Sequence, residues 1–274
     1  MSAAAASLRV EPGFAFPTEW IALDAAEQRR LHGHCGIPPE RYGAHCDAGL
    51  LARRTITLNT AAIQASRPGL APVHVVHRLR QHAPAPLGEK LRLDGRYVEI
   101  ADARRGQIAR SRWEYRRDDG VVVLTVEPDV MMADPERKGD AGGKRAAAAP
   151  REEDTGGWAV LTRKQCTPET TCGYCLNTTN LIHTDPATAR RYGFRAPIIA
   201  GNQTVNFVLE ALSLDARPRS FDIEIRFRKP VFWDDAVAIE GRRDAAGTLT
   251  GIRAVNGEGA TVADATVNAV AYGG

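Results

Sequence analysis

The residues best suited to chemistry lie in one stretch of the chain, from Leu176 to Leu212. His183 can accept or donate a proton near neutral pH. Asn180 can orient water or an imidazole but cannot titrate, and Thr178 can hold a water molecule. A helix is predicted to begin at Gly201, and the free N–H groups of its first turn would stabilise a developing negative charge. On their own, these residues predict a pocket that activates an electrophile, and they do not identify its substrate.

Local elements around these residues are expected to position them. Asp185 is expected to cap a short helix. The apolar segment 197–200 then leads into the helix at Gly201, where glycine lets a ligand carbonyl approach closely. The apolar residues of this helix fall at helical spacing on one face, namely Val205, Val208, Leu209 and Leu212. Each residue also has a structural interpretation, since a single histidine after two aliphatic residues is commonly structural and Gly201 also permits tight helix packing.

The chain reads as two similar halves, each with helices followed by an antiparallel meander. Arg41-Tyr42-Gly43 matches Arg191-Tyr192-Gly193, and Leu93-Asp94-Gly95-Arg96 matches Ile239-Glu240-Gly241-Arg242. A long helix on a curled antiparallel sheet buries the apolar faces of both, so we expect an α+β fold. The predicted parts are a disordered tail at 1–10, an N-terminal domain at 11–133, a flexible linker at 134–157 and a C-terminal domain at 158–274. The linker is predicted because its residues are small, charged and nearly free of large apolar groups.

Local signals place the helices and strands. Asp24 and Glu27 form a capping-box signature that predicts a helix over 25–33. A second helix is expected over 47–66, and Thr167-Pro168-Glu169 is a typical helix start. Alternating apolar residues predict strands, most clearly in Phe221–Arg228. The predicted strands are 73–82, 89–100, 108–117, 121–128, 158–164, 221–228, 236–243, 249–255 and 261–270.

The stretch resembles the active-site segment of the MaoC-like hydratases and dehydratases, which have the hot-dog fold. That family carries Asp, any residue, Asn, Pro, an aliphatic residue and His, followed by a Thr-Asp pair, a short helix, and a Gly-aromatic-x-x-Pro-aliphatic elbow before the central helix. The matching residues here are Asn180, Ile182, His183, Thr184-Asp185-Pro186, Gly193-Phe194-Arg195-Ala196-Pro197-Ile198 and Gly201. The match covers the C-terminal half well and the N-terminal half only as a degenerate repeat. The resemblance therefore implies a double hot-dog fold, in which one half keeps the catalytic loop and the other mainly shapes the acyl pocket.

The sequence departs from the family motif at three positions. Thr178 stands where the family has Asp, Leu181 where it has Pro, and Ala200 where a His is common. A one-residue slip would place Asn177 at the aspartate position, and this residue is not ionisable either. Related hydratase subgroups also vary this aspartate, so its absence does not exclude hydration.

The resemblance implies hydration of an enoyl thioester, or dehydration of a 3-hydroxyacyl thioester. It implies His183 as acid or base, with Asn180 and Thr178 beside it. It also implies four substrate-binding residues, which are Gly201, Asn202, Ala200 and Pro197. A first alternative is a hot-dog protein that binds an acyl thioester without this chemistry, or that serves as a non-catalytic partner subunit. A second alternative keeps the fold and changes the reaction, for example to thioester hydrolysis.

The expected partner is an acyl-CoA or acyl-carrier-protein thioester. No cofactor and no metal are expected. Both a homodimer and a hetero-oligomer are compatible with the sequence. The 274 residues carry a net charge of +3, far from that of a dedicated nucleic-acid-binding protein. No apolar run is long enough to span a membrane. The N-terminus lacks the pattern of a secretory signal, and an odd number of five cysteines in a long chain favours free thiols in the cytoplasm.

Other polar residues are expected to be structural. Cys166, Cys172, Cys175 and His183 do not have the spacing of a standard zinc site. His74, His77 and His82 lie in a strand region, and the opposite parity of His77 and His82 argues against one facing cluster. We therefore expect these histidines on the surface or hydrogen-bonded in the core. The arginines Arg78, Arg80, Arg226 and Arg228 are expected on solvated strand faces, with CoA phosphates as an alternative contact.

Overall fold

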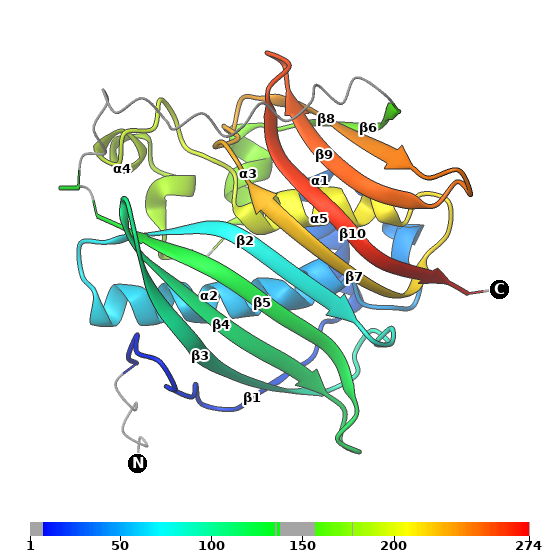
Figure 1. Ribbon diagram of the computed structural model, residues 1–274, viewed down its shortest axis with the longest axis horizontal. Coiled ribbons are helices and arrows are strands. Elements are labelled where there is room, and N and C mark those ends of the chain that lie inside the picture. Colours follow the sequence, from blue (N-terminus) through cyan, green and yellow to red (C-terminus); the bar gives the residue numbers. More distant parts are fainter. Residues whose placement is uncertain (1–7, 135, 138–156, 177, 274) are drawn as a thin grey trace.

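One antiparallel sheet forms the framework of the protein (Figure 1). The computed structural model describes residues 8–134, 136–137, 157–176 and 178–273, and within them ten strands pair in the order β1-β3-β4-β5-β2-β7-β10-β9-β8-β6. The strands are β1 (Glu19–Ile21), β2 (Ala71–Gln81), β3 (Leu91–Ala103), β4 (Gly106–Arg116), β5 (Val122–Ala133), β6 (Trp158–Gln165), β7 (Pro218–Phe227), β8 (Ala236–Arg243), β9 (Leu249–Asn256) and β10 (Thr261–Tyr272). Every predicted strand is present, and β1 is an addition that pairs with β3.

The strand order has an approximate two-fold symmetry about the β2–β7 pair. β1, β3, β4, β5 and β2 of the first half correspond to β6, β8, β9, β10 and β7 of the second. The repeated motifs that contain Gly95 and Gly241 lie on the corresponding strands β3 and β8. The two halves share this continuous sheet and a hydrophobic core to which both contribute.

Helices cover the concave face of the sheet. They are α1 (Ala25–Cys35), α2 (Ala48–Ser66), α3 (Pro168–Tyr174), α4 (Pro186–Arg191) and α5 (Gly201–Leu212), with short 3-10 helices at Pro39–Tyr42 and Leu181–His183. The predicted helix starts are confirmed, because Asp24, Asp47, Thr167 and Asp185 all accept a hydrogen bond from the first turn that follows them.

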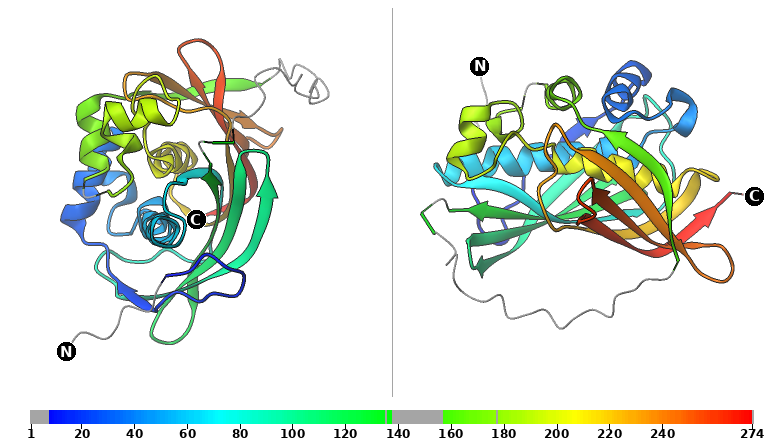
Figure 2. Two further views of the ribbon diagram at one scale, coloured as in Figure 1. Left: turned by 90° about the vertical axis from the view of Figure 1, so that its left-hand side faces the viewer. Right: turned by 90° about the horizontal axis from the view of Figure 1, so that it is seen from above.

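The two central helices, α2 and α5, lie between the sheet and an outer layer formed by α1, α3 and α4 (Figure 2). This arrangement changes the prediction for α5. Its apolar residues were expected to define one buried face, whereas every residue from Asn202 to Leu212 is buried. The polar residues of α5 are therefore enclosed as well, and hydrogen bonds connect them to neighbouring helices.

The predicted disordered tail at 1–10 is partly wrong. Val10 is only 4% exposed and belongs to the core, and Leu8 packs against it. Residues 1–7 and most of the predicted linker, 135 and 138–156, lie outside the described residues. The five cysteines are free thiols. Among the described residues, no helix has both the length and the apolar character needed to cross a membrane.

Candidate active site

A cavity of about 850 Å³ lies at the N-terminus of α5, and both halves line it. The first half contributes one side of α2 and the beginning of β2. The second half contributes the loop that follows α3, the start of α5 and the segment after β7. Six of the seven predicted site residues line this cavity, which are Thr178, Asn180, His183, Ala200, Gly201 and Asn202.

Pro197 is the predicted site residue that does not line the cavity. It is a buried residue of the elbow, and its carbonyl accepts a hydrogen bond from Trp233 N at 3.0 Å. The next two residues are held from both sides, since Ile198 N donates to the Ile182 carbonyl at 3.2 Å and Ile199 N donates to the Val231 carbonyl at 2.9 Å. Pro197 thus helps to fix the elbow, and the substrate-binding role predicted for it is not supported by its position.

His183 is held in one orientation. Its Nδ1 lies 2.9 Å from the Ile198 carbonyl oxygen. Because a carbonyl only accepts, the proton of the neutral ring lies on Nδ1 and Nε2 keeps its lone pair. Burial lowers the pKa of His183, partly opposed by the hydrogen bond to Ile198. The ring is therefore neutral near pH 7, with Nε2 available as a base.

Asn180 and Thr178 shape the loop around this imidazole. Asn180 Nδ2 donates to the Pro72 carbonyl at 3.3 Å and lies 3.5 Å from His183 Nε2. Thr178 Oγ1 accepts a hydrogen bond from Asn180 N at 3.2 Å. The threonine therefore stabilises the turn that carries Asn180, and it supplies no ionisable group. Asn177, the other candidate for the aspartate position, lies outside the described residues.

The first turn of α5 is open to a ligand. Its N-cap is Ala200, whose side chain cannot accept a hydrogen bond from the first free N–H groups. Asn202 Nδ2 donates to the Gly49 carbonyl of α2 at 3.3 Å, which ties the two central helices together. The helix N-terminus can thus stabilise negative charge on a bound oxygen.

The corresponding position in the first half is closed. Asp47 caps α2 and accepts a hydrogen bond from Gly49 N at 2.8 Å. His32 Nε2 and Asn206 Nδ2 each lie 2.9 Å from Asp47 Oδ2, and all three side chains are buried. The protein's own carboxylate therefore occupies the N-terminus of α2.

His74 lines the cavity and was missed in the sequence. It was expected on the surface or hydrogen-bonded in the core, and His77 was not grouped with it. A β-bulge between His74 and Val76 in the pairing with β5 leaves Val75 as an extra residue, so His74 and His77 face the same side. His77 Nδ1 and His74 Nε2 lie 2.8 Å apart. No signal in the sequence marks this bulge.

Cations surround the rim of the cavity. Arg105 and Lys229 line it and are exposed, and neither has an ion pair with any described residue. Arg30 and Arg53 also line it and donate to the carbonyls of Gly173 and Tyr174. The four arginines that were expected on solvated strand faces lie in two different environments. Arg78, Arg80 and Arg226 form ion pairs on the sheet, whereas Arg228 lines the cavity and pairs with Asp264.

No group of three His, Cys, Asp or Glu residues within the described ranges is arranged to bind a metal ion. Cys175 lines the cavity, but burial raises the pKa of its thiol to about 12. The thiol is therefore protonated near neutral pH and is a poor nucleophile.

The fold is similar to those of solved structures. HtdX from Mycobacterium tuberculosis matches with a TM-score of 0.74 and 18% identity over 92% of this chain and 99% of that one. A MaoC-like dehydratase from Phytophthora capsici matches with a TM-score of 0.65 and 16% identity, over 96% of this chain and 98% of that one. A conserved hypothetical protein from Mycobacterium tuberculosis, described as having a double hot-dog fold, matches with a TM-score of 0.62 and 17% identity, over 94% and 95% of the two chains. No protein-family model and no curated protein matches the sequence. The symmetric ten-stranded sheet around two central helices, together with these likenesses, shows that the chain has a double hot-dog fold.

Proposed function

We propose that this protein is a MaoC-like hydratase or dehydratase that acts on an enoyl or 3-hydroxyacyl thioester. The observation that carries the proposal is the orientation of His183. Its Nδ1 is held by the Ile198 carbonyl, while its basic Nε2 shares a cavity with the N-terminus of α5. This combination supplies a base and a site for a developing oxyanion, which are two of the requirements for adding water to an enoyl thioester.

The proposed hydration uses one imidazole for both proton transfers. His183 Nε2 takes a proton from water while the water oxygen bonds to the β-carbon, and Asn180 orients the water. The electrons of the double bond move toward the thioester oxygen, where the N–H groups at Gly201 stabilise the enolate. The imidazolium then gives the proton to the α-carbon and returns to its neutral form. Dehydration is the reverse sequence, and neither direction requires a carboxylate at Thr178.

The charge around the cavity supports an anionic carrier for the acyl group. The exposed cations Arg105 and Lys229 lie at its rim without ion pairs to described residues. Phosphates of coenzyme A, or the phosphopantetheine of an acyl carrier protein, would provide the missing anions. We therefore propose a CoA or carrier-protein thioester as the substrate.

Substitution of His183 tests this function. The parent protein should hydrate an enoyl-CoA or dehydrate a 3-hydroxyacyl-CoA, and His183→Ala should lower kcat/KM about 10²–10⁴-fold because the base is lost. His82→Ala is the control, since His82 lies outside the cavity and bonds Thr125. Full turnover in His183→Ala would overturn the mechanism.

Thr178 supports a second candidate, an acyl-thioester-binding protein or a non-catalytic partner subunit, because a carboxylate is absent at that position. Binding of several enoyl-CoA substrates without turnover by the purified parent would favour this candidate, and clear turnover would reject it. Release of free CoA would instead indicate thioester hydrolysis, so CoA release is measured in the same assay.

A further inference from the structure

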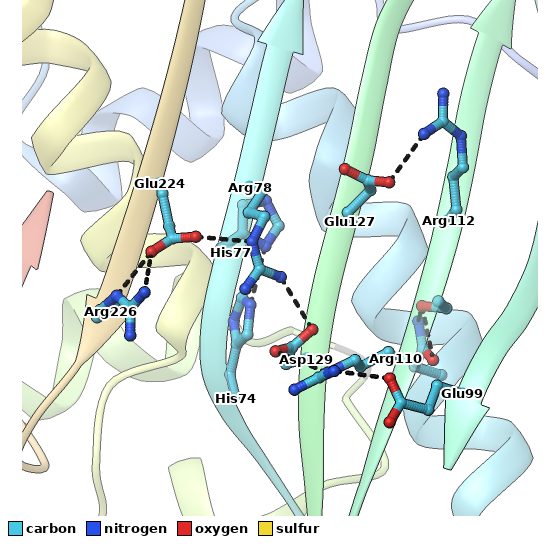
Figure 3. Close-up of polar contacts among 12 residues, drawn as sticks. His74, His77, Arg78, Glu99, Arg110, Arg112, Glu127, Asp129, Glu224 and Arg226 are labelled. Carbon is cyan, nitrogen blue, oxygen red and sulfur yellow. Dashed lines mark hydrogen bonds and ion pairs between the residues drawn. The ribbon is translucent and has the colours of Figure 1, made fainter. Parts of the chain in front are cut away.

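A pair of histidines on β2 is not used in the proposed mechanism. His77 and His74 are joined by a 2.8 Å hydrogen bond between His77 Nδ1 and His74 Nε2 (Figure 3). His77 is fully buried, whereas part of His74 faces the cavity. The outer nitrogen of each ring, His77 Nε2 and His74 Nδ1, is buried without a hydrogen-bond partner. Of these two rings, His74 lines the cavity and His77 does not.

The buried Nε2 of His77 determines where the protons lie. The two rings share one proton in their hydrogen bond, so one of the two outer nitrogens must carry the other. On His77 Nε2 this N–H would be enclosed in the core, whereas on His74 Nδ1 it lies beside the cavity, where a bound ligand can accept it. The proton of His77 therefore lies on Nδ1 and is donated to His74 Nε2. Burial lowers the pKa of His74 to about 3, so this ring is neutral at physiological pH. Because its Nε2 accepts, the single proton of His74 lies on Nδ1.

The Nδ1–H group of His74 lies at the first turn of α5. A Cβ atom built on Gly201 would come within 2.6 Å of His74 Nδ1. The ring is held there by His77 and by Phe227, whose ring centroid is 4.6 Å from that of His74. A thioester oxygen bound at the N-terminus of α5 would therefore lie beside this N–H donor.

We propose that His74 is a catalytic residue of the oxyanion site, a neutral imidazole whose Nδ1–H donates a hydrogen bond to the thioester oxygen. His77 is a positioning residue that fixes the tautomer of His74. This inference rests on the proposed binding of an acyl thioester in the cavity. Each half then contributes one histidine to the same site, since His183 moves the proton and His74 stabilises the charge on oxygen.

The polarisation of a bound carbonyl tests this role without turnover. A saturated acyl-CoA with a ¹³C-labelled thioester carbonyl cannot be hydrated, and isotope-edited infrared spectroscopy reports its carbonyl stretching frequency. The parent protein should lower this frequency relative to free ligand, and His74→Phe and His74→Leu should reduce the shift. Neither variant has an N–H donor in the side chain, and His74→Phe keeps an aromatic ring that can pack against Phe227. His74→Gln, which keeps a neutral N–H donor, should retain more of the shift.

Kinetics give a second measurement. Loss of one oxyanion donor should lower kcat about 10²–10³-fold in His74→Phe, with a smaller loss in His77→Leu because the tautomer is no longer fixed. Other titratable groups that line the cavity include His183, Tyr174 and Cys175, and burial raises the pKa of the tyrosine and the cysteine. The charged groups that line it are Glu27, Arg30, Arg53, Arg54, Arg105, Asp134, Arg228 and Lys229, and Tyr192 lines it as well. A neutral donor does not titrate near pH 7, so the loss in His74→Phe should be the same at pH 6.5 and pH 8.5.

The outcomes separate this inference from the proposed function. An unchanged carbonyl frequency in both donor-free variants overturns the role of His74, even if the parent turns over its substrate. A frequency shift that depends on His74, in a parent protein without hydratase or dehydratase turnover, supports the inference and overturns the proposed function. A loss that changes with pH between 6.5 and 8.5 overturns the neutral-donor role, and a parent that binds no acyl-CoA overturns both proposals.

Discussion

Thr178 is the residue at which this site differs most from the motif it resembles. Its hydroxyl accepts a hydrogen bond from Asn180 N, and it lines the same cavity as His183. A carboxylate at this position could accept the same hydrogen bond while adding a negative charge to the cavity. That charge would favour the protonated form of His183, because opposite charges stabilise each other at short range.

Thr178→Asp should therefore raise the pKa of His183. Burial holds this pKa below the ordinary value of 6.5, so the activity of the parent should fall only when the pH drops below that value and Nε2 becomes protonated. In Thr178→Asp, the acid limb of the kcat/KM profile should move to higher pH. Thr178→Asn has the same shape without the charge and should leave the limb in place. Equal profiles for the two variants would contradict His183 as the titrating base.

Gly201 makes close contact with the other histidine of the cavity. A Cβ at residue 201 would lie 2.6 Å from His74 Nδ1, so Gly201→Ala must displace the imidazole. We expect the free energy of unfolding to fall by roughly 1–3 kcal/mol through overpacking, measured by urea denaturation. Gly257→Ala is the matched control, because a Cβ there meets no atom within 4 Å. The cost of Gly201→Ala should shrink in a His74→Ala background, and additive effects would argue against this contact.

The sequence predicted the part of the site that is continuous along the chain. Asn180 and His183 could be recognised because a turn and a helix start bring neighbouring residues together. His74 could not, because one extra residue at Val75 changes the strand alternation between His74 and His77, and nothing in the sequence marks this bulge. Pro197 was assigned to the substrate because it lies in the elbow along the chain. Its place relative to the cavity depends on tertiary contacts such as the hydrogen bond from Trp233 N to the Pro197 carbonyl, which the sequence does not reveal.

The pairing of β2 with β7 joins the two halves, and one arginine connects three strands across it. Arg78 on β2 donates to Glu224 on β7 at 2.7 Å and to Asp129 on β5 at 3.1 Å (Figure 3). The side chain of Asp129 is only 6% exposed, and its other cation, Arg110, lies 3.5 Å away. Arg112 has ion pairs with Glu114 and Glu127 that stay within the first half and are more exposed.

Arg78→Met should lower stability more than Arg112→Met. Removing Arg78 leaves the nearly buried Asp129 with Arg110, at 3.5 Å, as its remaining cation, which should cost on the order of 2 kcal/mol. Removing Arg112 leaves more exposed carboxylates that water can solvate, at a cost of about 0–1 kcal/mol. Urea denaturation of both variants measures the difference. Equal losses would show that the interaction across the β2–β7 pair adds nothing beyond an ordinary surface ion pair.

Local signals predicted the elements well, and their packing less well. The N-caps at Asp24, Asp47, Thr167 and Asp185 depend on residues within one turn, so they can be read directly from the sequence. The complete burial of α5 depends on α1, α2 and the sheet, which no local pattern describes. Buried polar residues such as Asn206 were missed for this reason, although Asn206 bonds both Asp47 and Tyr174.

The whole molecule combines two related halves into one site. The N-terminus of α5 opens into the cavity, whereas Asp47 fills the equivalent position of α2. The first half supplies β2, which carries His74 and the Pro72 carbonyl that holds Asn180. The cavity is therefore lined by both halves, and the two predicted domains, 11–133 and 158–274, share one continuous sheet and one core.

Buried neutral histidines make the stability of this molecule depend on pH. Burial lowers the pKa of His74, His77 and His183 below the value of 6.5 expected in an unfolded chain. Below pH 6.5 the unfolded chain therefore binds protons that the folded protein excludes, and the free energy of unfolding falls as the pH falls. Each fully buried group contributes about 1.4 kcal/mol per pH unit. Because His74 and His183 face a cavity, the three groups together set an upper limit of about 4 kcal/mol per unit.

Urea denaturation between pH 5.0 and pH 7.5 measures this dependence, above the range in which most carboxylates titrate. The free energy of unfolding should be constant above pH 7 and should decrease steeply below pH 6.5. A double variant, His74→Phe with His77→Leu, removes two buried histidines and should flatten the decrease, because His77 is fully buried, while the less buried His34, His45 and His82, whose pKa values are also lowered, remain. An unchanged slope in this variant would mean that His74 and His77 are protonated as readily in the folded protein as in the unfolded chain. Such a result would also remove the physical basis for His74 as a neutral hydrogen-bond donor at the N-terminus of α5.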